Sequence, residues 1–210
     1  MKIDEKLAQG RQFRSMTMGI AEGEEYRVEG YATTFNEPYL LYKVDDVEVW
    51  EVVSEKAFEN TDMSDVIMQY DHEGRVFARL SNNTLELNVD ERGLLINAYL
   101  GGTQLGRGLY EDIKGGYITK MSFGFTVDED EIEEVSSGEG VKVTRTITKI
   151  GKLYDVSAVS IPANDATEIS ARNYCDGVIA ELETERMKRA QEKRNRQIKK
   201  LRLELELEDF

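Results

Sequence analysis

Alternation of apolar and polar residues along much of the chain limits what it can fold into. In residues 85–89, Leu, Leu and Val alternate with Glu and Asn, and a second apolar alternation runs through residues 94–100. A period of two places apolar side chains on one face of a strand, and residues 90–93 have the composition of a turn. These residues predict a β-hairpin. Similar alternation after Tyr26 and across residues 141–161 predicts a mostly β domain.

Helical signals are fewer. Thr103 can cap a helix that carries Leu105, Leu109 and Ile113, and the glycine pair that begins at Gly115 would end it. We therefore expect a mostly β fold with flanking helices, in the α+β class.

The chain divides by composition into three segments. Residues 1–25 are polar and form a leader or a first strand, and residues 26–174 carry the strand and helix patterns. Residues 175–210 are highly charged and mostly helical in pattern, although their final Leu-Glu-Leu-Glu-Leu fits a strand equally well. Residues 128–140 are acidic with Ser and Gly, which predicts a surface loop.

Composition excludes several classes of function. The chain has 27 Lys and Arg against 41 Asp and Glu, a net charge of −14, which disfavours specific nucleic-acid binding. Cys175 is the single cysteine, so neither an internal disulfide nor a cysteine metal site is expected. The first residues lack the apolar core of a signal peptide, and no stretch is apolar and long enough to cross a membrane. We expect a soluble, cytoplasmic protein.

His72 is the only histidine in the chain. Histidine is the one side chain that titrates near neutral pH without perturbation, so a hydrolase with a histidine base would have to use His72. A metal site built from several histidines is excluded. The alternative is a packed, structural histidine at the end of a strand.

Ser122 is the candidate nucleophile. If residues 120–125 form a strand, Met121, Phe123 and Phe125 share a buried face, and Ser122 points the other way. Gly124 lies beside it on that face and offers no side chain to obstruct an approaching substrate. The alternative is a small polar residue on a half-exposed strand.

Asp155 is the candidate acid. Tyr154 and Val156 are expected on the core face, which leaves Asp155 on the opposite one, and an Asp within a strand is against propensity. The alternative is a surface carboxylate or the partner of a nearby Lys or Arg. Asp165 and Glu168 are further candidates for the same role.

Together the three residue types complete a Ser-His-acid triad. The hydroxyl is a poor nucleophile until a base takes its proton, and the carboxylate fixes the imidazole tautomer. Sequence spacing does not test this hypothesis, because the fold assembles a triad from distant segments.

Six short motifs cover most of the chain in one order. They are Glu29-Gly-Tyr-Ala-Thr-Thr-Phe-Asn36, the Lys56-Ala-Phe58 turn, Gln69-Tyr-Asp-His72 with Gly74-Arg75, Leu94-Leu-Ile-Asn-Ala98, Lys120-Met-Ser-Phe-Gly-Phe125, and Asp155-Val-Ser157 through Ile161-Pro-Ala-Asn164. With these motifs the chain resembles, from about Tyr26 to Asn173, the prohead (capsid maturation) proteases of tailed phages of the HK97 type, relatives of the herpesvirus assemblins.

The resemblance implies a fold and a site. The fold is a small antiparallel β-barrel flanked by helices, followed here by the charged C-terminal arm. His72 matches the family's catalytic histidine and Ser122 its nucleophile. Asp155 stands where the family usually has Glu, which shortens the reach to His72. The herpesvirus relatives use a second histidine that this chain lacks.

The resemblance also implies a function. Such a serine endopeptidase cleaves phage scaffold, or the N-terminal scaffold-like region of the major capsid protein, and often itself, inside the immature capsid in the host cytoplasm. Its partners are the capsid and scaffold proteins. The arm lies outside the resemblance, and two alternatives are open for it: self-association through a stripe of Ile198, Leu201 and Leu205, or an ordinary solvated charged helix. No cofactor, metal or membrane is expected.

Two other readings fit the same residues. One is a non-catalytic assembly scaffold of the same fold that works through its charged arm. The other is a β-rich binding module in which His72, Ser122 and Asp155 lie far apart.

Overall fold

The computed structural model describes the chain in several stretches. These are residues 10–137, 140–160, 177, 180, 184, 187–188 and 191–199. The chain divides into two units, Met1–Arg172 and Asn173–Phe210, each described here by itself. In the second unit residues 191–199 are helical and exposed, in line with the helical pattern of the predicted arm. Asp165, Glu168, Cys175, Leu201, Leu205 and the Ile161–Asn164 motif lie outside the described residues.

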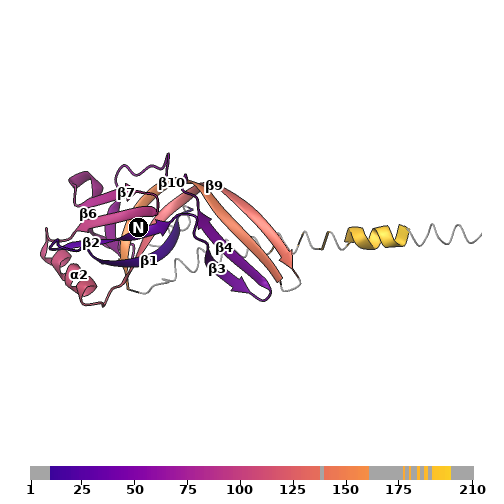
Figure 1. Ribbon diagram of the computed structural model, residues 1–210, viewed down its shortest axis with the longest axis horizontal. Coiled ribbons are helices and arrows are strands. Elements are labelled where there is room, and N and C mark those ends of the chain that lie inside the picture. Colours follow the sequence, from indigo (N-terminus) through magenta and orange to yellow (C-terminus); the bar gives the residue numbers. More distant parts are fainter. Residues whose placement is uncertain are drawn as a thin grey trace, which may run out of the picture. The chain divides into compact units, whose positions relative to one another are not determined.

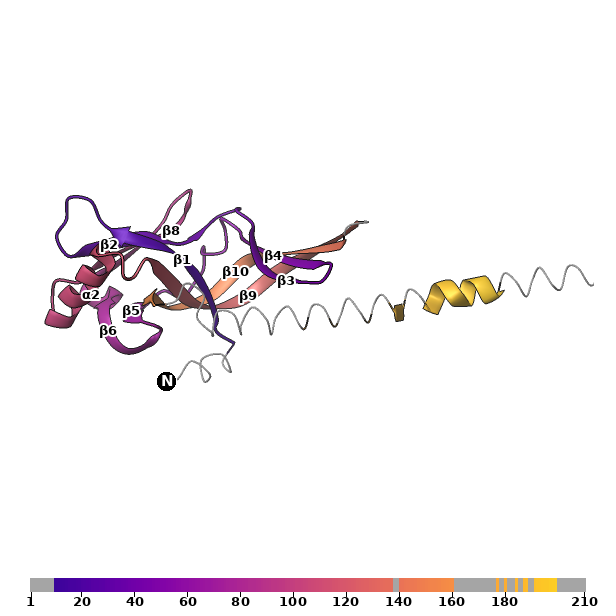
Figure 2. The same ribbon diagram turned by 90° about the horizontal axis from the view of Figure 1, so that it is seen from below.

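The described residues of the first unit form ten strands, which Figures 1 and 2 show from two sides. They are β1 (Gln12–Ile20), β2 (Arg27–Thr34), β3 (Tyr39–Val44), β4 (Val47–Val53), β5 (Ile67–Tyr70), β6 (Glu73–Arg79), β7 (Leu85–Val89), β8 (Gly93–Tyr99), β9 (Lys120–Ser137) and β10 (Gly140–Val159). A 3-10 turn η1 (Leu80–Asn82) and helix α2 (Gln104–Lys114) complete it. The mostly β prediction is confirmed.

The strands form one open, mixed sheet. Their order is β3-β4-β10-β9-β1-β2-β8-β7, with β5 paired to β10 and β6. Strand β10 is parallel to both β4 and β5, and the other pairs are antiparallel. Among the described strands, β3 and β7 end the path and do not pair with each other. The expected closed antiparallel barrel is therefore not observed, because the two end strands leave the sheet open and β10 has two parallel neighbours.

The predicted hairpin and helix are both present. β7 and β8 pair antiparallel, and Asp90 Oδ1 accepts the backbone N–H groups of Arg92 and Gly93 at 2.8 and 3.0 Å to fix the turn. The Thr103 hydroxyl accepts the Gly106 N–H at 2.9 Å and caps α2.

One face of α2 is buried. Leu109 and Ile113 lie in the core, whereas Leu105 is 53% exposed, contrary to its expected place on the same apolar stripe. Leu105 is in the first turn of the helix, at the edge of the contact.

Part of the predicted polar leader belongs to the sheet. Residues 12–20 form β1, which lies between β2 and β9. The first residues of β1 bring Phe13 to a fully buried position. The alternative of a first strand is therefore the one observed for these residues.

The predicted acidic loop is a strand. β9 continues to Ser137 and pairs with β10 along its length, so that Asp130 lies opposite Ile147. Figures 1 and 2 show this part of β9 and β10 projecting with β3 and β4, away from α2. Side chains from Asp128 to Ser137 are exposed on both faces. Such a strand lacks apolar alternation, which is why its composition resembles that of a loop.

Candidate active site

His72 lies in a two-residue turn between β5 and β6. Asp71 and His72 have φ angles of 47° and 58°, the left-handed pair of a type I′ turn. Non-glycine residues adopt this region at a cost, so the surrounding structure must hold them there. The Asp71 N–H donates to the Ala158 carbonyl at 2.9 Å, and its carboxylate accepts the Ser160 N–H and hydroxyl at 2.9 and 2.8 Å. The histidine turn is thereby tied to the end of β10.

The His72 ring is fully buried. It packs against the Phe13 ring in a T-shaped arrangement, with centroids 4.4 Å apart, and its Nδ1 is hydrogen-bonded to Asp155 Oδ1. Because a carboxylate only accepts, Nδ1 carries the proton in this pair. In the neutral ring the basic nitrogen is then Nε2, on the far side from Asp155.

Asp155 is held in a narrow space on β10. Its Oδ1 also accepts the Ser157 hydroxyl at 2.9 Å, while Oδ2 has no hydrogen-bond partner among the described residues. A Cβ at Gly124 would lie 2.7 Å from Oδ2 and 2.9 Å from Phe13 Cε1. Position 124 therefore requires glycine, because the Asp155 carboxylate and the Phe13 ring occupy the space that a side chain would fill.

A β-bulge precedes Asp155. Leu153 lies opposite Phe125 and Asp155 opposite Gly124, so β10 has one extra residue, Tyr154, at this point. The prediction that Tyr154 faces the core is wrong. Leu153 takes that position, and the Tyr154 ring instead lies 3.6 Å from the guanidinium carbon of Arg11.

Ser122 lies at the centre of a row of three serines that crosses the sheet. β9 pairs with β1 and β10, so that Ser122 is opposite Ser15 on one side and Ser157 on the other. Directly opposite residues point to the same face, and we call these three the serine row. Among the described residues the hydroxyls of Ser122 and Ser15 have no hydrogen-bond partner.

The structure thus joins two of the three predicted residues and brings the third close. His72 and Asp155 are hydrogen-bonded, and Ser122 lies on the strand next to Asp155 without a hydrogen bond to the ring. Ser122, His72 and Asp155 are 0%, 0% and 1% exposed. A peptide carbonyl reaches the Ser122 hydroxyl only after covering atoms move aside.

The sequence matches the family of caudovirus prohead serine proteases over residues 12–178. The chain belongs to this family. The resemblance predicted from the motifs is confirmed, and the match begins at the first residue of β1. The protease is accordingly a serine peptidase of phage capsid maturation, acting on capsid or scaffold protein inside the procapsid in the host cell. No curated protein and no solved structure matched the chain.

Two further findings concern the described part of the protease. It contains no group of three or more His, Cys, Asp or Glu side chains arranged to hold a metal ion. Within the same part, no helix has the length and hydropathy needed to cross a bilayer.

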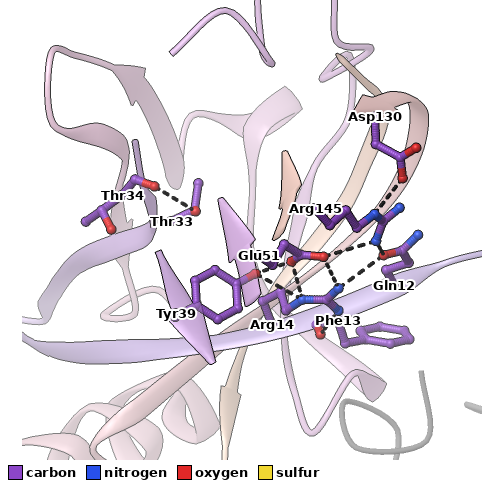
Figure 3. Close-up of polar contacts among 9 residues, drawn as sticks. All are labelled: Gln12, Phe13, Arg14, Thr33, Thr34, Tyr39, Glu51, Asp130 and Arg145. Atoms are coloured by element: carbon purple, nitrogen blue, oxygen red, sulfur yellow. Dashed lines mark hydrogen bonds and ion pairs between the residues drawn. The ribbon is translucent and has the colours of Figure 1, made fainter. Parts of the chain in front are cut away.

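The protease also has a buried charged cluster that the sequence reading missed (Figure 3). Glu51 of β4 is fully buried, and Arg14 donates to its two oxygens at 2.6 and 2.7 Å. Arg145 donates to Glu51 Oε2 at 3.0 Å, and the Tyr39 hydroxyl is hydrogen-bonded to Oε1. We call these four residues the Glu51 cluster.

The cluster is fixed in one protonation state. Burial would raise the pKa of Glu51, but the guanidinium groups of Arg14 and Arg145 hold it below its ordinary value. Burial and the neighbouring Glu51 carboxylate raise the pKa of Tyr39 well above its ordinary value. Neither group exchanges a proton near neutral pH, so the Glu51 cluster has a structural character.

A signal for this cluster was present in the sequence. Glu51 continues the alternation of Val47, Val49 and Val53, which places a carboxylate on the apolar face of β4. A buried carboxylate needs a cationic partner, and that requirement points to a buried arginine elsewhere in the sheet.

Proposed function

We propose that the protease cleaves peptide bonds with Ser122 as nucleophile, His72 as general base and acid, and Asp155 as the acid that orients His72. The observation that carries the proposal is the buried hydrogen bond between His72 Nδ1 and Asp155 Oδ1, one strand away from Ser122. The substrate is the scaffold or the N-terminal scaffold-like region of the major capsid protein, together with the protease's own tails.

The chemistry follows from the tautomer. Ser122 Oγ attacks the peptide carbonyl carbon as its proton passes to His72 Nε2. The proton on Nδ1 stays there and remains hydrogen-bonded to Asp155. The tetrahedral intermediate collapses, and Nε2 returns the proton to the leaving amine. A water molecule then repeats the sequence on the acyl-enzyme, releasing the second product and restoring the serine hydroxyl.

The serine row offers three hydroxyls, and its hydrogen bonds favour Ser122. Ser157 donates to Asp155, on the Nδ1 side of the imidazole, where no base is available. Ser15 lies one strand further from Asp155 than Ser122 does. The Ser122 hydroxyl has no hydrogen bond to any described residue, and Ser122 is nearer in the sheet than Ser15 to the strand that carries Asp155.

The contact with Asp155 also bears on the departure from the family pattern. The family usually has Glu at this position, and Asp is shorter by one methylene group. With the same backbone position, Asp would be too short to reach the imidazole. Asp155 nevertheless reaches Nδ1, and it does so from the residue that follows the bulge. This supports Asp155 as the third member and counts against the binding-module reading, in which the three residues lie apart.

The test is co-expression of the protease with its cognate capsid precursor, with intact masses read for both proteins. We expect cleavage by the wild type and by Ser15→Ala, and none by Ser122→Ala. Ser15→Ala is the matched control because it removes a hydroxyl from the same row. Masses of the protease itself report cleavage of its tails in the same spectra.

Cleavage that persists in Ser122→Ala would remove Ser122 from the mechanism. Particles that mature with uncleaved protein in all three forms, yet fail to assemble without the chain, would favour the scaffold reading.

A further inference from the structure

We infer that Ser157 is a positioning residue: its hydroxyl fixes the angle at which the Asp155 carboxylate receives the His72 Nδ1–H. The inference rests on the proposed triad, of which Ser157 is not a member. Its starting point is the hydrogen bond of 2.9 Å from Ser157 Oγ to Asp155 Oδ1, the same oxygen that holds the imidazole.

Strand geometry keeps the Ser157 hydroxyl in place. Ser157 and Asp155 are two residues apart on β10, so their side chains project from the same face. β10 is flanked here by β9 and β5, with Ser122 and Gln69 directly opposite Ser157. The residue is fully buried, so its hydroxyl has no solvent to turn towards.

The two oxygens of Asp155 are consequently distinct. Oδ1 accepts two hydrogen bonds, which uses both of its lone pairs, and Oδ2 faces the bare backbone of Gly124 with no described partner. With His72 as its one partner, the carboxylate would be free to turn part of the way about its Cβ–Cγ bond while one oxygen stayed near Nδ1. Ser157 opposes that rotation, because its own hydrogen bond to the same oxygen would be strained or lost.

The consequence for the reaction is an imidazole held at one angle. His72 lies in a turn rather than in a strand, so its ring is oriented by Phe13 and by Asp155. A carboxylate that rotates would let the ring rock and would misdirect Nε2 from Ser122. Misplacement of a catalytic group by a fraction of an ångström lowers the rate without removing any reacting atom.

The first test reads the hydrogen bond directly. His72 is the only histidine, so ¹⁵N-histidine labelling gives one imidazole spectrum with no assignment problem. In a Ser122→Ala background, which prevents self-cleavage, we expect a far-downfield Nδ1–H proton. Adding Ser157→Ala should move that proton upfield or broaden it beyond detection, whereas adding Ser15→Ala should leave it unchanged. An unchanged signal in Ser157→Ala would overturn the inference.

The second test reads the rate on a peptide that spans the cleavage site. Ser157→Ala should lower kcat about tenfold with little change in KM, as expected for the loss of one hydrogen bond to a charged group. Ser157→Thr, which keeps the hydroxyl, should show the wild-type Nδ1–H signal and recover most of that loss. Equal loss of signal and rate in Ser157→Thr would overturn the inference.

The two tests separate this inference from the proposed function. The spectrum needs no catalysis, so a shifted signal would support Ser157 even if Ser122→Ala still cleaved the precursor. The opposite result is cleavage that depends on Ser122 together with an Nδ1–H signal that Ser157→Ala does not change. It would support the triad and overturn the positioning role of Ser157.

Discussion

Two carboxylates are buried in the sheet, and their surroundings differ. Both Glu51 oxygens accept hydrogen bonds, from Arg14, Arg145 and Tyr39. Asp155 is hydrogen-bonded to His72 and Ser157 but to no Lys or Arg among the described residues, and one of its oxygens has no partner there. The neighbouring Ser122 hydroxyl is likewise unpaired within the described part.

The difference separates the structural Glu51 cluster from the proposed catalytic residues. A buried polar group that lacks a partner costs stability, and such groups collect where an incoming ligand will supply the missing contacts. Glu51 and its partners gain nothing from further ligands. Substitutions in the Glu51 cluster should therefore lower mainly the stability, and substitutions in the proposed triad mainly the activity.

The largest expected effect is on activity, from His72→Asn. Asn tolerates the left-handed conformation of the turn, so the fold should be kept, but it offers no base. We expect the cleavage rate to fall at least about 1,000-fold with only a small change in melting temperature. Rates come from the spanning peptide and melting from circular dichroism. A variant that keeps a tenth of the wild-type rate would exclude His72 as the base.

Glu51→Ala should have the largest effect on stability. It leaves Arg14 and Arg145 buried without their counter-charge, which costs about 3–5 kcal/mol of unfolding free energy. Urea denaturation measures this directly. Glu48→Ala, on the same strand with a partly exposed ion pair to Lys43, is the matched control and should lower the unfolding free energy far less, because solvent screens that pair. Equal losses in both variants would mean that the Glu51 cluster is not a structural centre.

Gly124→Ala should lower both the stability and the activity, each to a lesser degree than the two variants above. The new Cβ would press on Asp155 Oδ2 and on the Phe13 ring, so overpacking should cost about 1–3 kcal/mol. Because the displaced atoms support His72, the peptide-cleavage rate should fall as well. Gly108→Ala, in α2 with open space at its Cβ, is the control that should keep both stability and rate. A Gly124→Ala variant with wild-type rate would contradict the packing described for Asp155.

The smallest expected effect is the pH dependence due to Glu51. The pKa of Glu51 lies below its ordinary value of 4.5, so its contribution to stability is present in full above that value and is lost as pH falls through the lower, folded value. The unfolding free energy of the wild type should therefore fall more steeply than that of Glu51→Gln between about pH 5 and pH 3. Parallel pH curves would show that Glu51 is not held ionised by Arg14 and Arg145.

Much of the sheet could be predicted from the sequence, because alternation reports which face a side chain occupies. It located the β7–β8 hairpin and assigned Ser122 and Asp155 to faces opposite the core. It failed for the acidic half of β9, where both faces meet solvent and no apolar period exists. It also failed at Tyr154, because a bulge adds one residue there and interrupts the alternation of side chains between the two faces.

The candidate site was only partly accessible to the same reasoning. Residue types suggested the triad, but the contact between His72 and Asp155 depends on β5 pairing in parallel with β10, a long-range arrangement that no local pattern encodes. The proposed role of Ser157 and the close packing over Gly124 depend on distances of less than 3 Å. Such distances follow from register, which local sequence patterns alone do not determine.

Strand β10 carries both Arg145 and Asp155, and this constrains how the gene can change. Because side chains alternate along a strand, loss or gain of a single codon between these two positions would invert the face of one of them relative to the other. Either Arg145 would then point away from the Glu51 cluster, or Asp155 would point away from His72. Length variation in this interval should therefore occur in pairs of residues, or in single residues absorbed by one of its bulges, when related chains are compared.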